Sequence, residues 1–278
     1  MPTNSPPLPP EPASLDVRFT GAVYTPQNVA AALVDKVSGL LTGSGLRILE
    51  PSVGDGAFLR AMRQRWAGDQ FTLVDIDDAV IADLQQQELA RKSPRATLHA
   101  RDFIGYAVDL IQDGSPPFDL IIGNPPFIRS RNFSEPLKAS VDALAQAVDY
   151  ARPQIKNSWA AFLAASAQLA GPAGVVALVL PYELITVAYG QAALRRLTAQ
   201  FRRIDVYISK EKAFPEIDQD AIILIAQKAG QEAPGLFMNQ VDRLSDLSAG
   251  EGHALDLSEG ADASVELNAF LLKGDTVS

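Results

Sequence analysis

The residues best suited to chemistry in this 278-residue chain are Asn124-Pro125-Pro126-Phe127, directly after the apolar run 118–123. Two prolines fix φ and remove two N–H donors, so the turn is stiff. The Asn124 side-chain oxygen and the Pro125 carbonyl can both accept from one amino group, and Phe127 can stack on a planar ring. Drawing electron density onto that nitrogen favours attack on an electrophilic methyl group. The alternative is a proline-stiffened loop in which Phe127 is incidental.

A second group of residues surrounds a glycine turn between a predicted strand and a predicted helix. Gly54 and Gly56 allow close approach of a ligand to the backbone, and the helix start offers free N–H groups. Glu50 ends the strand with a carboxylate that suits a cationic ligand. Asp75 ends the next strand and can accept from ribose hydroxyls. The turn lacks the full G-x-G-x-x-G pattern and alone fits any tight connection, but the four residues together predict a nucleotide-type cofactor.

Asp102 and Phe103 follow the predicted strand 96–100. Asp102 can accept from an adenine amino group while Phe103 packs on the ring. Because an Asp-Phe pair is common, it supports the cofactor prediction only in company with the glycine turn.

The elements that must position these residues follow an α/β pattern. Short runs rich in Val, Ile and Leu predict seven strands, at 46–50, 71–75, 96–100, 118–123, 175–180, 204–208 and 221–227. Longer segments predict helices at 26–41, 57–67, 79–91, 158–170 and 190–201, the first with Thr25 as N-cap and Pro26 just inside. No helix is evident between the last two strands, which predicts a hairpin. We expect a doubly wound, mostly parallel seven-stranded sheet that ends in this antiparallel hairpin.

The composition excludes several classes of protein. The chain has no cysteine, which excludes disulfide scaffolds, thiol catalysis and Cys-ligated zinc, and its two histidines argue against a His-based metal site. The longest apolar runs are too short to cross a bilayer, and no basic-then-apolar leader begins the chain. We therefore expect no metal, no membrane segment and a cytoplasmic protein.

In their order along residues 19–228, these motifs resemble the gamma-class S-adenosylmethionine-dependent N6-adenine DNA methyltransferases of restriction-modification systems. The segment 21–27 resembles the motif that closes over the methionine end of the cofactor, and 212–216 resembles the motif whose Phe stacks on a flipped adenine. The resemblance implies a catalytic set of Asn124, Pro125, Pro126, Phe127 and Phe214. It implies a set binding S-adenosylmethionine of Tyr24, Thr25, Glu50, Ser52, Gly54, Gly56, Asp75, Ile76, Asp102, Phe103 and Asn124. For Phe214 the alternative is a loop side chain that packs on the sheet.

The resemblance also implies double-stranded DNA as the substrate. The target base must leave the duplex to reach such a pocket. DNA contacts would come from basic residues near the site, although each one taken singly fits a solvated surface charge: Arg129, Arg131, Lys138, Arg152, Lys156, Arg195, Arg196, Arg202, Arg203, Lys210 and Lys212.

The predicted organisation is a disordered, proline-rich leader at 1–18, a catalytic domain at 19–228 and an acidic linker, or the start of an absent recognition domain, at 229–278. The similar enzymes carry a further C-terminal domain that reads DNA sequence. We therefore expect a fragment or split half, or recognition by a separate domain, subunit or restriction nuclease. Two other functions stay open: methylation of a protein glutamine or a ribosomal RNA amine, and a non-catalytic cofactor-binding subunit.

The net charge of −9 is unevenly distributed. Residues 1–228 hold 22 basic and 24 acidic residues, a balance of −2, whereas residues 229–278 hold 2 and 9, a balance of −7. Because phosphate binding depends on Lys and Arg, the chain alone is expected to bind DNA weakly and in a salt-sensitive way.

Overall fold

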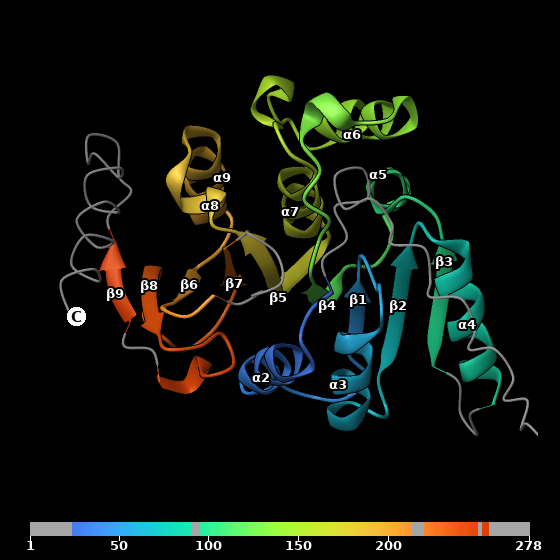
Figure 1. The fold of residues 1–278 in the computed structure, drawn as a ribbon, viewed down its shortest axis with the longest axis horizontal. Helices are drawn as coiled ribbons and strands as arrows, with labels where there is room; N and C mark the ends of the chain where they lie inside the picture. The colour runs from blue at the N-terminus through green and yellow to red at the C-terminus, as the bar shows by residue number, and fades with distance from the viewer. Residues whose placement is uncertain (1–23, 91–94, 213–219, 250–251, 256–278) are drawn as a thin grey trace, which may run out of the picture.

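The computed structural model describes residues 24–90, 95–212, 220–249 and 252–255. Within them the chain forms one nine-stranded sheet in the order β3-β2-β1-β4-β5-β7-β6-β8-β9 (Figure 1). Its strands are β1 Arg47–Glu50, β2 Gln70–Asp75, β3 Ala96–Ala100, β4 Phe118–Gly123, β5 Ala170–Pro181, β6 Arg203–Ser209, β7 Ala221–Gln227, β8 Gly235–Val241 and β9 Gly252–Leu255. The predicted leader at 1–18 and Phe214 lie outside the described residues.

The strand directions confirm the predicted mostly parallel sheet with an antiparallel hairpin. Strands β3, β2, β1, β4 and β5 pair in parallel, and β7 pairs antiparallel with both β5 and β6. The centre of the sheet is buried on both faces, and every residue of β7 is buried. This double burial explains why the strands are near-continuous runs of apolar residues.

The sheet has nine strands rather than seven. Strands β8 and β9 extend it beyond β6, in the part of the chain where the sequence predicts an acidic linker. In β8, Leu236, Met238 and Val241 are buried while Gly235 and Gln240 are exposed. Leu236 and Met238 pack into the core on one side of the sheet and Val241 into the core on the other, with the buried polar Asn239 between them. The apolar signal of this short strand is thus interrupted by polar residues.

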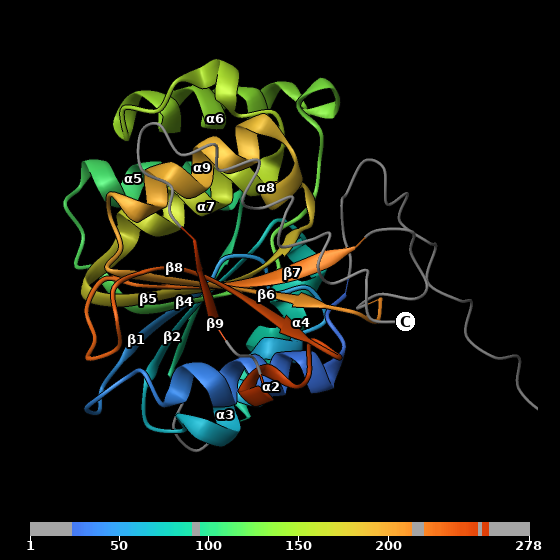
Figure 2. The same ribbon diagram turned by 90° about the vertical axis from the view of Figure 1, so that its left-hand side faces the viewer.

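Helices cover both faces of the sheet (Figure 2). Helices α2, α3 and α4 lie on one face, and α5, α7, α8 and α9 lie on the other with α6 outside them. Their bounds are α2 Gln27–Ser38, α3 Ala57–Arg65, α4 Asp78–Leu89, α5 Phe103–Gln112, α6 Glu135–Ala147, α7 Ser158–Leu169, α8 Glu183–Thr186 and α9 Ala188–Thr198. No helix among the described residues is both long and apolar enough to cross a membrane.

The helices differ from expectation at the start of α2 and in helices that the sequence did not predict, including the short α8. The N-cap of α2 is Pro26 rather than Thr25, and the Pro26 carbonyl accepts from Val29 and Ala30. Thr25 is thereby free of a capping role. Helices α5 and α6 were not predicted, although Asp102 and Ser134 cap them with side-chain oxygens.

The topology creates a crevice where the chain changes direction across the sheet. Strand β1 pairs with β2 on one side and β4 on the other, so the segments leaving β1 and β4 diverge to opposite faces. In doubly wound sheets ligands bind at this point, beyond the carboxyl ends of the strands.

Candidate functional site

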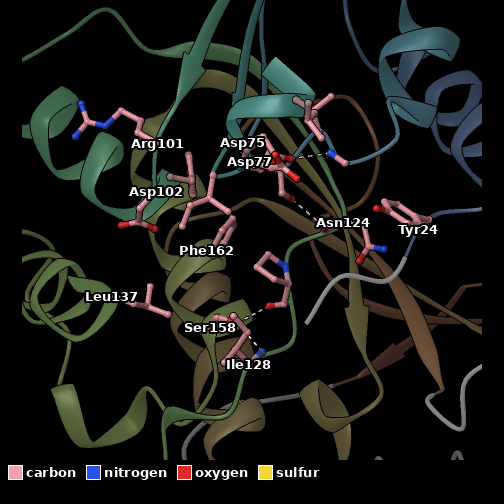
Figure 3. Close-up of a pocket in the computed structure, with 18 of the residues that line it drawn as sticks. Tyr24, Asp75, Asp77, Arg101, Asp102, Asn124, Ile128, Leu137, Ser158 and Phe162 are labelled. Atoms are coloured by element: carbon pink, nitrogen blue, oxygen red, sulfur yellow. Dashed lines mark hydrogen bonds between the residues drawn. The ribbon is translucent and has the colours of Figure 1, made fainter. Parts of the chain in front are cut away.

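A cavity of about 680 Å³ lies at the carboxyl ends of β1, β2 and β4 (Figure 3). Most of the residues predicted from the sequence line it together: Tyr24, Thr25, Ser52, Gly54, Asp75, Ile76, Asp102, Phe103, Asn124 and Pro126. The predicted Glu50, Gly56, Pro125 and Phe127 are not among its lining residues. Groups drawn from segments up to a hundred residues apart thus face one space.

The glycine turn is held by the acid at the end of β2. The Gly54 N–H donates to Asp75 Oδ2 at 2.8 Å, and Asp75 Oδ1 accepts from the Asp77 N–H at 2.9 Å. Gly54 and Gly56 have φ of 54° and 78°, which favours glycine at both positions. Asp75 therefore shapes the turn, and its remaining lone pairs can still accept from a ligand.

Tyr24 and Ile76 present apolar surface to the cavity. Ile76 is 76% exposed and Tyr24 is 59% exposed, which is unusual for large apolar side chains. The Tyr24 ring lies so near the glycine turn that a Cβ at Gly54 would meet it at 3.5 Å. Both side chains can be covered by a ligand that fills the cavity.

Glu50 directly precedes the lining residue Pro51 and is fully buried at the end of β1. Neither of its carboxylate oxygens has a hydrogen-bond partner in the described part of the chain. Burial, together with the nearby charges of Asp55 and Asp75, raises the pKa of Glu50 well above its usual range, although Arg60 and Arg63 oppose the shift. A buried carboxyl without a hydrogen-bond partner is chemically suited to a cationic group.

Asp102 and Phe103 have structural roles that the sequence did not predict. The Asp102 carboxylate accepts from the N–H groups of Ile104 and Gly105, so it caps α5. Phe103 is 2% exposed, and its ring packs on that of Phe162 with centroids 4.9 Å apart. The pair still borders the cavity, but Phe103 offers a ligand little of its surface.

Three side chains hold the Asn-Pro-Pro-Phe turn (residues 124–127) where β4 ends. The Asn124 carbonyl accepts from Ser52 Oγ at 2.9 Å, and Asn124 Nδ2 donates to Thr25 Oγ1 at 3.1 Å. At the other end, Ser158 Oγ donates to the Pro126 carbonyl and accepts from the Ile128 N–H. Two prolines remove donors from this turn, and hydroxyls from three other segments supply its hydrogen bonds instead.

Sequence reasoning missed several residues of the cavity wall, among them Asp77, Arg101, Leu137, Ser158 and Phe162, labelled in Figure 3. Leu137 lies on α6, which was itself not predicted. Ser158 and Phe162 lie on the predicted helix α7, but a serine at a helix start ordinarily indicates a cap. No spacing rule links them to a turn thirty residues away.

Several of the basic residues predicted to contact DNA already form ion pairs. Arg129 lies 3.8 Å from Glu183, and Lys210 lies 2.9 Å from Asp242. Arg203 pairs with Asp205 and Glu232. The described residues include no group of three or more His, Asp or Glu side chains suited to a metal ion.

Comparison with known proteins shows which sequences this chain resembles. A sequence model of the Eco57I restriction-modification methylase family matches residues 60–214. The Type II methyltransferase M.TthHB8I of Thermus thermophilus is 30% identical over 79% of this chain and 48% of its own length. The tRNA1(Val) (adenine(37)-N6)-methyltransferase of Serratia proteamaculans is 32% identical over 58% of this chain and 57% of its own length.

A solved structure shares the fold. The methyltransferase subunit of a type I restriction-modification system from Streptococcus thermophilus superposes with a TM-score of 0.58 at 18% identity, over 90% of this chain and 53% of that one. The chain spans less than half the length of the Type II methyltransferases it matches.

Proposed function

Because this chain belongs to the Eco57I restriction-modification methylase family, we propose that it transfers a methyl group from S-adenosylmethionine to the N6 amino group of a flipped adenine in DNA. The observation that carries the proposal is that Asn124 lines the same cavity as Gly54, Asp75 and Asp102. A candidate acceptor for an amino group and a candidate nucleotide site therefore share one space.

The residues around the cavity fit S-adenosylmethionine. Glu50, buried and without a hydrogen-bond partner, suits the cationic methionine end. Asp75 has lone pairs for ribose hydroxyls, and the exposed Ile76 offers an apolar surface for the purine. When bound, the cofactor supplies an electrophilic methyl group. The remaining predicted cofactor residues, including Thr25, Ser52 and Gly56, stay part of this proposal.

The chain's own residues would bind and polarise the amino group. Asn124 Oδ1 and the Pro125 carbonyl accept from the two N–H bonds, which draws electron density onto nitrogen in the direction of attack. Phe127 stacks on the target base and offsets part of the unstacking cost, by about 1–3 kcal/mol per base. Phe214, which lies outside the described residues, remains the proposed second stacking ring.

Adenine is supported as the target by a relative's chemistry. The Serratia relative is by name an adenine N6-methyltransferase, and it acts on a tRNA. DNA is supported by the Type II methyltransferases, which match four-fifths of this chain. The same tRNA relative makes RNA adenine the second candidate substrate.

The proposed catalytic unit includes β8 and β9, since both strands pair with the same sheet. Because the chain spans less than half of its Type II relatives, reading of a DNA sequence is proposed to come from a further domain or from a partner subunit. A restriction nuclease is the other partner expected of such a system.

The test is to incubate the protein with methyl-labelled S-adenosylmethionine and unmethylated DNA, with total tRNA in a parallel reaction, and to identify the labelled nucleoside. We expect N6-methyladenine in DNA, lost in Asn124→Ala and retained in Asn28→Ala, an exposed asparagine on α2. Label in tRNA or protein alone would contradict the DNA proposal. Cofactor binding without any transfer would instead support a non-catalytic subunit.

A further inference from the structure

One buried hydroxyl contacts the backbone on both sides of Phe127. Ser158, the first residue of α7, is fully buried. Its Oγ donates to the Pro126 carbonyl and accepts from the Ile128 N–H at 2.8 Å. These groups belong to the two peptide planes that flank Phe127, and φ and ψ of Phe127 set how those planes are turned relative to each other. Holding both planes therefore fixes the direction of the Phe127 side chain.

The surrounding backbone brings this hydroxyl into position. The Ser158 N–H donates to the Ile128 carbonyl at 2.8 Å, and the Ser130 N–H donates to the Lys156 carbonyl at 2.9 Å. Arg129 and Asn157 form an antiparallel bridge between these two bonds. The backbone pairing ends at Ile128, and the Ser158 side chain continues it with a hydrogen bond to the Pro126 carbonyl in the turn.

The support behind Ser158 is rigid. Its neighbour Trp159 is fully buried and stacks on Tyr189 with ring centroids 5.7 Å apart. All but two of the residues of α7 are buried. A group held by a packed helix can position a reactive turn more accurately than one on a loop.

We infer that Ser158 is a positioning residue, whose hydroxyl holds the Asn-Pro-Pro-Phe turn in the shape that methyl transfer requires. This inference rests on the proposed function. Ser158 borders the cavity, but in this role it acts through the Pro126 and Ile128 peptide groups. Without the Ser158 hydroxyl, Phe127 and the Pro125 carbonyl can move relative to the base, while the residues proposed for the cofactor are unchanged.

The chain offers a matched control on the same helix. Ser166 is also fully buried in α7, but its Oγ has no hydrogen-bond partner in the described part of the chain. Ser158→Ala and Ser166→Ala therefore remove the same atom from the same helix, and only the first removes contacts to the turn. Ser158→Thr keeps the hydroxyl, and Ser158→Cys, a weaker hydrogen-bonding group of similar size, serves if the alanine variant does not fold.

The first readout is independent of any activity. Amide hydrogen exchange of Ile128, followed by NMR on the full chain without cofactor, reports the bond to Ser158 Oγ directly. We expect faster exchange in Ser158→Ala, with Ser166→Ala and Ser158→Thr close to the wild type. Unchanged exchange at Ile128 in Ser158→Ala would overturn the inference whatever the protein methylates.

The second readout is the single-turnover rate of transfer to adenine at saturating cofactor. We expect Ser158→Ala to lower it roughly 10- to 100-fold, as small displacements of reacting groups do, with the Kd for S-adenosylmethionine unchanged. Partial recovery of the transfer rate in Ser158→Thr supports positioning by the hydroxyl. Faster exchange with a wild-type transfer rate would overturn the positioning role. A wild-type protein that methylates no adenine would overturn the proposed function, while the Ile128 exchange still decides whether Ser158 holds the turn.

Discussion

Asn124 Nδ2 donates a hydrogen bond to Thr25 Oγ1 at 3.1 Å, across 99 residues of sequence. The bond directs the nitrogen end of the amide toward the segment before α2, so Oδ1 faces away from Thr25. An amide turned in this way presents an acceptor rather than a donor to a substrate amino group. Thr25 thus bears on the chemistry proposed for Asn124 as well as on the cofactor site.

Replacing Thr25 with valine should therefore slow methyl transfer. Valine keeps the shape of this buried side chain but removes the oxygen that accepts from Asn124. A hydrogen bond worth about 0.5–1.5 kcal/mol corresponds to a rate loss of about 2- to 12-fold. Thr25→Ser keeps the oxygen and should stay near the wild-type rate. Single-turnover transfer measures both, and equal rates in the two variants would refute the role.

Replacing Gly54 with alanine should weaken both the fold and cofactor binding. Gly54 has φ of 54°, a conformation that costs other residues about 1–2 kcal/mol. Its N–H also ties the turn to Asp75. Gly68→Ala is the control, because a Cβ there meets nothing within 4 Å and its φ is not positive.

Urea denaturation measures the free energy of unfolding of both glycine variants, and calorimetry measures their affinity for S-adenosylmethionine. Gly68→Ala should stay within about 0.5 kcal/mol of the wild type. If Gly54→Ala were equally stable and bound the cofactor equally well, the turn would not depend on glycine at this position.

The sequence predicted the central sheet because its signal is strong and local. All seven predicted strands are present: β7, for example, is apolar from Ala221 to Ala226 and buried throughout, and β4 is apolar and buried except at Asp119. Strand β8 was missed because polar Asn239 and Gln240 interrupt its apolar residues. Gly54, Asp75 and Asn124 could likewise be predicted to meet in one crevice, because each follows or ends a parallel strand whose carboxyl end lies at the same edge of the sheet.

The supporting contacts of the site could not be predicted in the same way. The bonds from Ser158 to the Asn-Pro-Pro-Phe turn join residues about thirty positions apart and depend on how α7 packs. The sequence predicted Asp102 as a cofactor residue but not as the cap of α5, because a carboxylate that follows a strand has the same local signature in both roles. Such contacts arise from tertiary packing, which the local sequence does not encode.

Glu50 should make the stability of the cofactor-free protein fall as pH rises. Burial raises the pKa of Glu50 in the folded state, whereas the unfolded chain releases this proton near the ordinary value of 4.5. Its stabilising contribution is complete below that value and is lost as pH rises toward the raised pKa of the folded state. Glu50→Gln resembles the neutral form and should become progressively more stable than the wild type as pH rises above 4.5 toward the raised pKa.

Denaturant unfolding at several pH values tests this difference, with Glu135→Gln as the control because the Glu135 side chain is 86% exposed. The same Glu50→Gln change should weaken binding of S-adenosylmethionine, since the proposed partner of its cationic end is lost. A variant that follows the wild-type pH profile, or binds the cofactor as tightly as the wild type, would contradict the role given to Glu50.

DNA binding by this chain alone should be weak and should fall steeply with salt. Residues 1–228 carry a net charge of only −2, and residues 229–278 add −7. Arg129, which follows the Asn-Pro-Pro-Phe turn, lies 3.8 Å from Glu183 and must exchange that carboxylate for a phosphate. Each phosphate contact contributes about −0.9 to the slope of log K against log salt.

Fluorescence anisotropy of a labelled duplex, titrated at salt concentrations between about 50 and 200 mM, measures that slope. Arg129→Ala should reduce its magnitude by about 1, the value for one phosphate contact. Arg95→Ala should leave it unchanged, because Arg95 is exposed just before β3, at the amino ends of the parallel strands and away from the cavity. Tight binding that is insensitive to salt would contradict the weak binding expected from the charge, and an equal effect of the two substitutions would contradict a phosphate contact at Arg129.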